Sequence, residues 1–144
     1  MNVFISGGCK NGKSFFAQEE AKKQADSQGV PLYYVATMIP ADEEDRARIH
    51  RHVAEREGWG FTTIEQGMNI CEILDRADPE GVFLLDSVTA LLSNEMFGRP
   101  EGIDLPAAER VKNELLEFAE KTGNTIFVSD YLYSDALQYD QFTE

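Results

Sequence analysis

The sequence predicts an α/β fold of three layers, in which helices cover both faces of a mostly parallel sheet. Short apolar runs alternate along the chain with longer segments of helical periodicity, a pattern typical of parallel βαβ units. A glycine-rich turn joins the first apolar run to the first helical segment. The length of 144 residues suits a single domain, over residues 1–144, that can bury a core of its own.

Four apolar runs are expected to form strands, at residues 3–6, 32–36, 82–86 and 125–129, with a weaker strand at 61–64. Helices are expected at 13–28, 42–57, 68–77, 88–97 and 107–122, with a loop at 98–106. The first helix carries Ala17, Ala21 and Ala25 at a spacing of four residues. The last helix is amphipathic, because Val111 and Phe118 share one face.

Charge and composition exclude several classes of protein. The chain carries a net charge of −13, whereas nucleic-acid and anionic-membrane binding both need a basic face. It has no apolar run near the ~18 residues of a membrane span, and its first residues do not resemble a signal peptide. Two cysteines, Cys9 and Cys71, indicate no disulfide framework. We therefore expect a cytoplasmic protein.

The glycine-rich turn fits the phosphate-binding P-loop pattern G-x-x-x-x-G-K-[ST]. Its residues are Gly7, Gly8, Cys9, Lys10, Asn11, Gly12, Lys13 and Ser14. The glycines let successive backbone N–H groups point at phosphate oxygens, and the helix dipole adds to the attraction. Lys13 is expected to reach the β- and γ-phosphates, and the Ser14 hydroxyl to ligate Mg²⁺. The alternative is an ordinary glycine-rich turn between a strand and a helix.

The apolar strand at 82–86 ends in Asp86, a pattern typical of the carboxylate that lies near Mg²⁺ in P-loop proteins. This signal is weak alone and gains weight from the P-loop upstream. The alternative is that Asp86 caps the helix that starts near Ser87, and both roles are compatible.

The helix at 42–57 begins with acidic residues and continues with basic ones, which suits the helix dipole. Glu44, Arg48, His52 and Arg56 are spaced by four residues and share one face. The alternative to a functional face is a solvated face laced with salt bridges. His50 and His52 point in different directions, so they do not form an obvious metal-binding pair.

Together these motifs resemble the bifunctional adenosylcobinamide kinase/adenosylcobinamide-phosphate guanylyltransferase family of cobalamin biosynthesis. The matching segments are Ser6–Ser14, Tyr34-Val35-Ala36-Thr37, Arg48-Ile49-His50-Arg51-His52, Arg56, Thr63-Ile64-Glu65, Leu84-Leu85-Asp86, Ser87-Val88-Thr89 and Ser93-Asn94. Their order and spacing run through nearly the whole chain, so the resemblance is more specific than any single motif.

The resemblance implies a P-loop NTPase-like fold and two reactions. A nucleoside triphosphate, ATP or GTP, phosphorylates the corrinoid substrate adenosylcobinamide, and GTP then donates GMP through a guanylyl-histidine. It implies His52 as the nucleophile, Lys13 as a second catalytic residue, and Ser14 and Asp86 as ligands of Mg²⁺. It implies nucleotide contacts from the P-loop and from Ala36, Thr37, Arg48, Arg56, Glu65 and Asp86. It also implies a homotrimer.

The chain is shorter than the family's usual pattern, because residues 134–144 begin a region that in the family continues into a further helix and strand. The loop residues Cys9, Lys10 and Asn11 also differ from the family's usual Ala-Arg-Ser. Two alternatives therefore stay open. One is a P-loop small-molecule kinase without guanylyl transfer. The other is a nucleotide- or corrinoid-binding protein without turnover. A nucleotide-hydrolysing switch is disfavoured, because no convincing guanine-reading Asn-Lys-x-Asp motif is present.

Overall fold

The computed structural model describes residues 2–7, 13–40, 42–98 and 102–130, and for residues 6, 7, 13–15, 52, 55 and 130 it describes the backbone alone. The five strands are β1 (Val3–Gly7), β2 (Leu32–Ala36), β3 (Thr62–Glu65), β4 (Val82–Asp86) and β5 (Thr125–Asp130). They form one sheet in the order β1-β5-β4-β2-β3. Each neighbouring pair is parallel, so all strands end at the same edge. The predicted α/β fold is confirmed.

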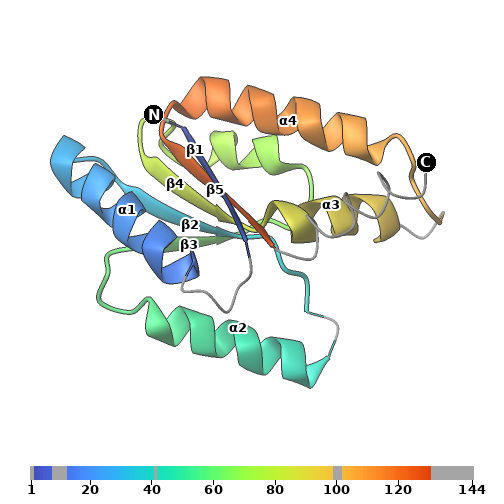
Figure 1. Ribbon diagram of the computed structural model, residues 1–144, viewed down its shortest axis with the longest axis horizontal. Helices are drawn as coiled ribbons and strands as arrows, with labels where there is room; N and C mark the ends of the chain where they lie inside the picture. Colours follow the sequence, from blue (N-terminus) through green and yellow to red (C-terminus); the bar gives the residue numbers. More distant parts are fainter. Residues whose placement is uncertain (1, 8–12, 41, 99–101, 131–144) are drawn as a thin grey trace.

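Helices cover both faces of this sheet (Figure 1). They are α1 (Lys13–Gln28), α2 (Glu43–Glu55), the 3₁₀ helix η2 (Ile70–Asp75), α3 (Val88–Phe97) and α4 (Ala107–Thr122). In the view of Figure 1, α4 lies above the strands, α3 beyond their right-hand ends, α1 at the left and α2 at the bottom. Packing places η2, α3 and α4 on one face of the sheet and α1 on the other. The three layers predicted from the alternation of apolar and helical segments are therefore present.

The face under η2, α3 and α4 holds the larger part of the core. Its buried members are mostly large side chains, namely Val35, Ile64, Ile70, Ile73, Phe83, Leu85, Val88, Leu91, Val111, Phe118 and Phe127. The Phe83 ring stacks on Tyr33 with 4.8 Å between centroids and meets Phe118 edge to face at 5.2 Å. Such aromatic pairs add to the free energy gained from burial alone.

The opposite face is covered by α1 through small side chains. Ala17 and Ala21 are fully buried and Ala25 is nearly so, and they pack on Leu32, Tyr34, Val82, Leu84, Ile126 and Val128. The four-residue spacing of the alanines places them on one side of the helix, as predicted. Because alanine is small, α1 lies close to the strands and its first turn is held near the end of β1.

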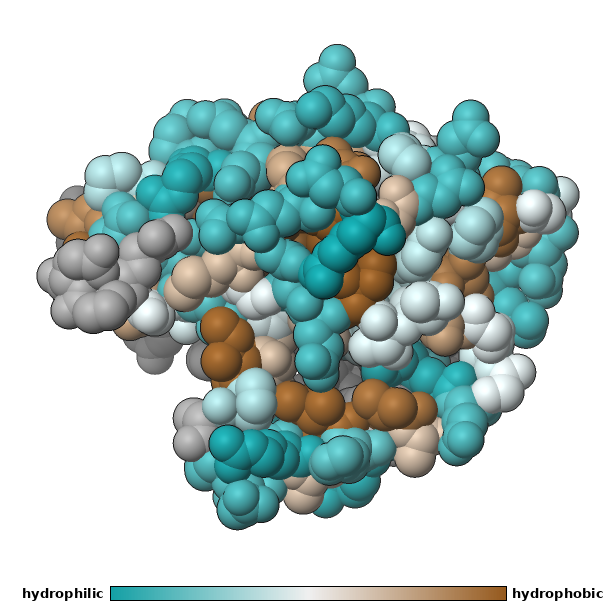
Figure 2. All heavy atoms as spheres, turned by 180° about the vertical axis from the view of Figure 1, so that it is seen from behind, coloured by the Kyte–Doolittle hydropathy of each residue, from teal (hydrophilic) through white to brown (hydrophobic). Residues whose placement is uncertain are grey.

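Helix α2 has no comparable apolar seam. Most of its described side chains are exposed, including Val53, and it forms the lower part of the molecule in Figure 1. Figure 2 shows the back of the molecule, where apolar surface lies along the junction between this lower lobe and the body. Apart from the residues that line the groove described below, this exposure fits the solvated face that the sequence analysis leaves open as an alternative.

Two helix boundaries differ from the predictions. The second helix ends at Glu55, not at residue 57, and a turn with positive φ at Gly58 and Gly60 follows it. The helix predicted at 68–77 is instead the shorter 3₁₀ helix η2, which buries Ile70 and Ile73. A spacing of three residues matches the three residues per turn of a 3₁₀ helix, so both isoleucines face the core.

Among the described residues, no helix combines the length and hydropathy that crossing a bilayer requires.

Candidate functional site

Four of the predicted site residues come together because their strands end at one edge of the sheet. Asp86 of β4 is level with Ala36 of β2, and Ala36 is level with Glu65 of β3. Gly7 ends β1, on the far side of β5. Two spacings between strands separate β1 from β4, or roughly 10 Å. In open parallel sheets, ligands bind beyond this edge, where the strand order reverses.

The P-loop candidate spans the gap between β1 and α1. Gly8, Cys9, Lys10, Asn11 and Gly12 lie outside the described residues, whereas Gly7 ends β1 and Lys13 and Ser14 begin α1. The strand before the loop and the helix after it are therefore as predicted. The positive end of the α1 dipole lies at the carboxyl edge of the sheet, where it favours an anion.

Asp86 accepts a hydrogen bond from a tyrosine, a partner that the sequence analysis missed. The Tyr34 hydroxyl donates to Asp86 Oδ2 over 2.5 Å. This hydrogen bond ties β2 to the last residue of β4 at the carboxyl edge of the sheet. The alternative in which Asp86 caps α3 is wrong, because Ser87 is the N-cap and its side chain accepts from the backbone N–H of Ala90.

Thr37 and Asn94 hold the ends of the strands together. The Thr37 hydroxyl donates to the Ser87 carbonyl over 2.8 Å and accepts from the Ser87 N–H over 2.7 Å, and Thr37 is fully buried. The Asn94 amide donates to the carbonyls of Thr37 and Gly67 over 2.7 and 3.0 Å. Thr37, a predicted nucleotide contact, thus lies in the scaffold just behind the edge that carries Asp86.

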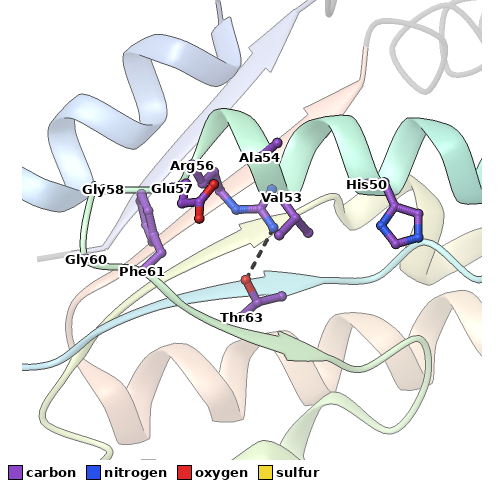
Figure 3. Close-up of a pocket in the computed structure, with 9 residues that line it drawn as sticks. All are labelled: His50, Val53, Ala54, Arg56, Glu57, Gly58, Gly60, Phe61 and Thr63. Carbon is purple, nitrogen blue, oxygen red and sulfur yellow. Dashed lines mark hydrogen bonds between the residues drawn. The ribbon is translucent and has the colours of Figure 1, made fainter.

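A groove of about 630 Å³ separates α2 from β3 (Figure 3). We call it the α2–β3 groove; its lining comprises His50, Val53, Ala54, Arg56, Glu57, Gly58, Gly60, Phe61 and Thr63. Its volume falls within the range of small-molecule sites, and it is open to solvent along α2. The groove combines one buried cation, an aromatic ring and several exposed polar groups.

Arg56 forms the buried wall of the α2–β3 groove, only 4% exposed. It follows α2 by one residue, and its guanidinium donates to Thr63 Oγ1 over 3.3 Å. Its guanidinium carbon lies 3.5 Å from the centroid of the Tyr34 ring, a cation–π contact in a site withdrawn from solvent. Arg56, predicted to share one face with Arg48, is thus buried just beyond the end of α2, whereas Arg48 is exposed on the helix.

Both histidines lie on α2, and the structure describes the side chain of His50 alone. His50 lines the α2–β3 groove together with Val53 and Ala54, three and four residues later (Figure 3). The backbone of His52 lies in α2, but its side chain is outside the described part of the chain. Positions two apart on a helix differ by about 200° around its axis, which is why the two histidines do not form an obvious metal-binding pair.

Within the part of the chain that the structure describes, no three His, Cys, Asp or Glu side chains gather into a metal-binding cluster. Asp86 is a hard oxygen donor at a sheet edge, which fits an Mg²⁺ held by one carboxylate, a hydroxyl and nucleotide phosphates. The Ser14 side chain lies outside the described residues. The donor chemistry of this pair therefore fits Mg²⁺.

Two solved structures resemble this fold. The flagellar accessory protein FlaH from Methanocaldococcus jannaschii matches with a TM-score of 0.51 and 17% identity over 90% of this chain and 60% of that one. A KaiC-like protein from Pyrococcus horikoshii matches with a TM-score of 0.47 and 19% identity over 89% and 59%. The chain thus spans about three fifths of the length of these proteins. The likeness to FlaH concerns the fold alone.

No curated protein sequence matches this chain significantly. The comparison with protein families, in contrast, matches residues 3–142 to the family described as cobinamide kinase / cobinamide phosphate guanyltransferase. That match covers the P-loop candidate, the Asp86 strand and both histidines of α2. The chain therefore belongs to the cobinamide kinase / cobinamide phosphate guanyltransferase family.

Proposed function

We propose that this protein phosphorylates a cobinamide with a nucleoside triphosphate and then transfers GMP from GTP to the phosphorylated product. The observation that carries the proposal is the family match over residues 3–142. The sheet edge supports it, because the strand before the P-loop, the first turn of α1 and Asp86 meet there. By the same family resemblance we propose a homotrimer.

In the kinase reaction, the hydroxyl oxygen of the cobinamide attacks the γ-phosphorus of the triphosphate. The bond from the γ-phosphorus to the bridging oxygen breaks, the nucleoside diphosphate leaves, and the hydroxyl proton passes to solvent. The backbone N–H groups of the P-loop and the Lys13 ammonium would stabilise the charge on the phosphate oxygens. Asp86 and Ser14 would hold Mg²⁺, which when bound draws charge from the phosphates.

In the guanylyl transfer, a neutral imidazole nitrogen of His52 attacks the α-phosphorus of GTP, and pyrophosphate leaves. The phosphate oxygen of the cobinamide phosphate then attacks the same phosphorus, the P–N bond breaks, and the histidine is restored. Arg48 is exposed one turn before His52 and could approach the nucleotide's phosphates. Arg56 and Glu65 complete the proposed nucleotide contacts, together with Ala36 and Thr37 at the end of β2.

The test is covalent labelling with GTP carrying an α-phosphate label. The protein is incubated with labelled GTP and Mg²⁺, denatured, and examined for label, with His52→Ala and His50→Ala compared side by side. We expect an acid-labile label in the wild type and in His50→Ala but not in His52→Ala. The two variants are matched, because they remove the same group two residues apart on one helix.

A second candidate function is a small-molecule kinase without the covalent step. The loop residues Cys9, Lys10 and Asn11, which differ from the family's usual pattern, keep this candidate open. His50 lines the α2–β3 groove and is therefore the second histidine to test. Phosphorylation of cobinamide without any labelled protein would establish it. Label lost only in His50→Ala would instead keep guanylyl transfer and move the nucleophile to the groove. Nucleotide binding without either product would contradict both enzymatic functions.

A further inference from the structure

A buried chain of three side chains links the α2–β3 groove to the carboxyl edge of the sheet. Arg56 stacks on the ring of Tyr34, and the hydroxyl of Tyr34 donates to Asp86. Arg56 and Tyr34 are each only 4% exposed, whereas Asp86 is half-buried, so solvent screens the Arg56 end less than the Asp86 end. No sequence motif indicates this set of three side chains, because Tyr34, Arg56 and Asp86 are far apart in the sequence.

At one end of the chain, Arg56 fixes the turn that leads from α2 to β3. Its guanidinium lies 3.5 Å from the centroid of the Tyr34 ring and also contacts Thr63 at the start of β3. Its carbonyl accepts from the Trp59 N–H over 3.1 Å. Arg56 therefore links the Tyr34 ring and the start of β3 to the turn between α2 and β3.

At the other end, the Tyr34 hydroxyl binds the Asp86 carboxylate over 2.5 Å. The ring thus lies between a guanidinium and a carboxylate. The Arg56 cation polarises the Tyr34 phenol and makes its hydroxyl a better hydrogen-bond donor to Asp86. The Asp86 carboxylate in turn strengthens the attraction of the ring for Arg56. In a site of low dielectric this attraction is stronger than it would be in water.

We propose that Tyr34 is a positioning residue that couples the charge on Asp86 to the seating of Arg56 and thereby to the turn between α2 and β3. Neutralising Asp86 weakens the hydrogen bond from Tyr34 and thereby weakens the attraction of the ring for Arg56. The part of the proposal that concerns Mg²⁺ rests on the proposed function. In that setting, a cation at Asp86 loosens the wall of the α2–β3 groove.

The coupling is reciprocal, because linked equilibria affect each other equally. A ligand that draws Arg56 away from Tyr34 would release the Asp86 carboxylate for a cation. Ligand binding in the groove and cation binding at Asp86 would then affect each other, although the two sites share no residue. This gives Tyr34 a role in either the kinase or the guanylyl transfer reaction.

Trp59 provides a direct readout of the coupling. It is the chain's single tryptophan, half-buried and three residues after Arg56. Loosening of Arg56 should expose its indole, so acrylamide quenching of its fluorescence should rise towards that of the urea-unfolded protein. The measurement needs neither nucleotide nor metal, because Asp86→Asn removes the carboxylate charge directly.

The experiment compares acrylamide quenching in the wild type, Asp86→Asn, Tyr34→Phe and the double variant, with folding checked by far-UV circular dichroism. Tyr34→Phe keeps the ring beneath Arg56 and removes the hydroxyl. Tyr33→Phe, alone and with Asp86→Asn, is the matched control. Tyr33 is the next residue on β2, packs on the opposite face, and also loses a hydrogen bond, the one its hydroxyl accepts from the Asp78 N–H.

We expect Asp86→Asn to raise quenching in the wild-type and Tyr33→Phe backgrounds and to change nothing further in Tyr34→Phe. An equal rise in the Tyr34→Phe background, or no rise in the wild type, would overturn the proposal. Should Asp86→Asn not fold, the same comparison is made by adding Mg²⁺ with the α,β-methylene analogue of GTP, whose α–β bridge resists attack at the α-phosphorus. A change in the wild type and Tyr33→Phe that Tyr34→Phe lacks supports the coupling, and any other pattern overturns it.

Failure of the coupling and failure of the proposed function are distinguishable. The Asp86→Asn comparison reads the coupling without any reaction, whereas the labelling experiment reads guanylyl transfer without any fluorescence. A coupled protein that takes no label would retain this inference and lose guanylyl transfer.

Discussion

The two faces of the sheet are built differently, although each strand contributes to both. The face under α3, α4 and η2 is filled by large side chains such as Phe83 and Phe118, and its helices pack closely on them. The other face is covered at α1 by alanines, while α2 leaves the α2–β3 groove beside β3. One face supplies the larger part of the apolar burial, and the other holds the helix and the groove of the candidate site.

The difference between the faces shows that most of the stabilising apolar packing lies on one side of the sheet and the candidate site on the other. Apolar burial stabilises by roughly 25 cal/mol per Å², so the face with large side chains provides most of the driving force. Helix α2 buries little and can be reshaped at small loss of stability. Loosely packed elements are those that open most readily in folded proteins. We expect substitutions on the two faces to affect different measurements.

The largest expected effect is on stability, from Phe83→Ala on the well-packed face. Phe83 is fully buried between Tyr33 and Phe118, so its removal should lower the free energy of unfolding by about 3–5 kcal/mol. Urea denaturation followed by circular dichroism measures the change. Phe16→Ala makes the same change on α1, where Phe16 is 58% exposed, and should stay within about 0.5 kcal/mol. Equal losses would remove the distinction between the faces.

The next effect is on activity and comes from Lys13→Ala at the start of α1. Loss of a positioned cation at the phosphates should lower the rate of cobinamide phosphorylation by about 10²–10³-fold. The urea midpoint should stay near that of the wild type. Lys22→Ala is the control on the same helix, because Lys22 pairs only at the surface with Asp26 at 3.2 Å. Full activity in Lys13→Ala would contradict a phosphate-binding role for the loop.

A third prediction compares the two helices of the same face. Ala21 is fully buried against the sheet, so Ala21→Leu should overpack it and lower the free energy of unfolding by about 1–3 kcal/mol. Ala54→Leu puts the same side chain on the groove side of α2, where Ala54 is exposed, and should change it by less than about 0.5 kcal/mol. Thermal unfolding of both variants tests this. A loss at Ala54 as large as that at Ala21 would mean that α2 packs more tightly than the structure indicates.

The smallest effect concerns pH and the well-packed face. Burial, followed by repulsion from Glu117, raises the pKa of the Cys71 thiol to about 11. The folded protein therefore keeps a proton that the unfolded chain loses near the ordinary thiol pKa of about 8.5. This contribution to stability is fully present below the ordinary pKa and is lost as the pH rises towards the folded value.

The measurement is the urea midpoint at several pH values from neutral to alkaline, for the wild type and for Cys71→Ser. We expect the wild type to lose stability slightly faster with alkaline pH than the variant, whose hydroxyl does not titrate in this range. Parallel pH profiles would show that the thiol is no more shielded in the folded protein than in the unfolded chain.

Local sequence signals predict most of the elements. The strands at 32–36 and 82–86 and the helices at 13–28, 88–97 and 107–122 have the predicted bounds, because apolar runs and helical periodicity are properties of neighbouring residues. The α-helix predicted at 68–77 is wrong, because a pattern of neighbouring residues does not distinguish an α-helix from a 3₁₀ helix here. Two buried isoleucines three residues apart suit a 3₁₀ turn, and only their packing against the sheet selects it.

The residues of the candidate site also divide into those that the sequence predicts and those that only the structure reveals. The P-loop pattern and Asp86 stand in the sequence with their chemistry, and the parallel order of the strands brings them to one edge. The sequence does not reveal that β5 lies between β1 and β4, because strand order depends on contacts between distant segments. Nor does it reveal that His50 lines a groove or that Arg56 turns inward from a charged helix.

By itself, the sequence determined the α/β class, most element bounds and the family to which the chain belongs, since these depend on residue patterns read in order. Only the tertiary structure decided that Tyr34 stands between Arg56 and Asp86. Those residues lie 22 positions after it and 52 positions after it in the printed sequence. The physical reason is that burial, stacking and hydrogen bonding between distant residues arise only when the strands and helices pack, and no local pattern encodes them.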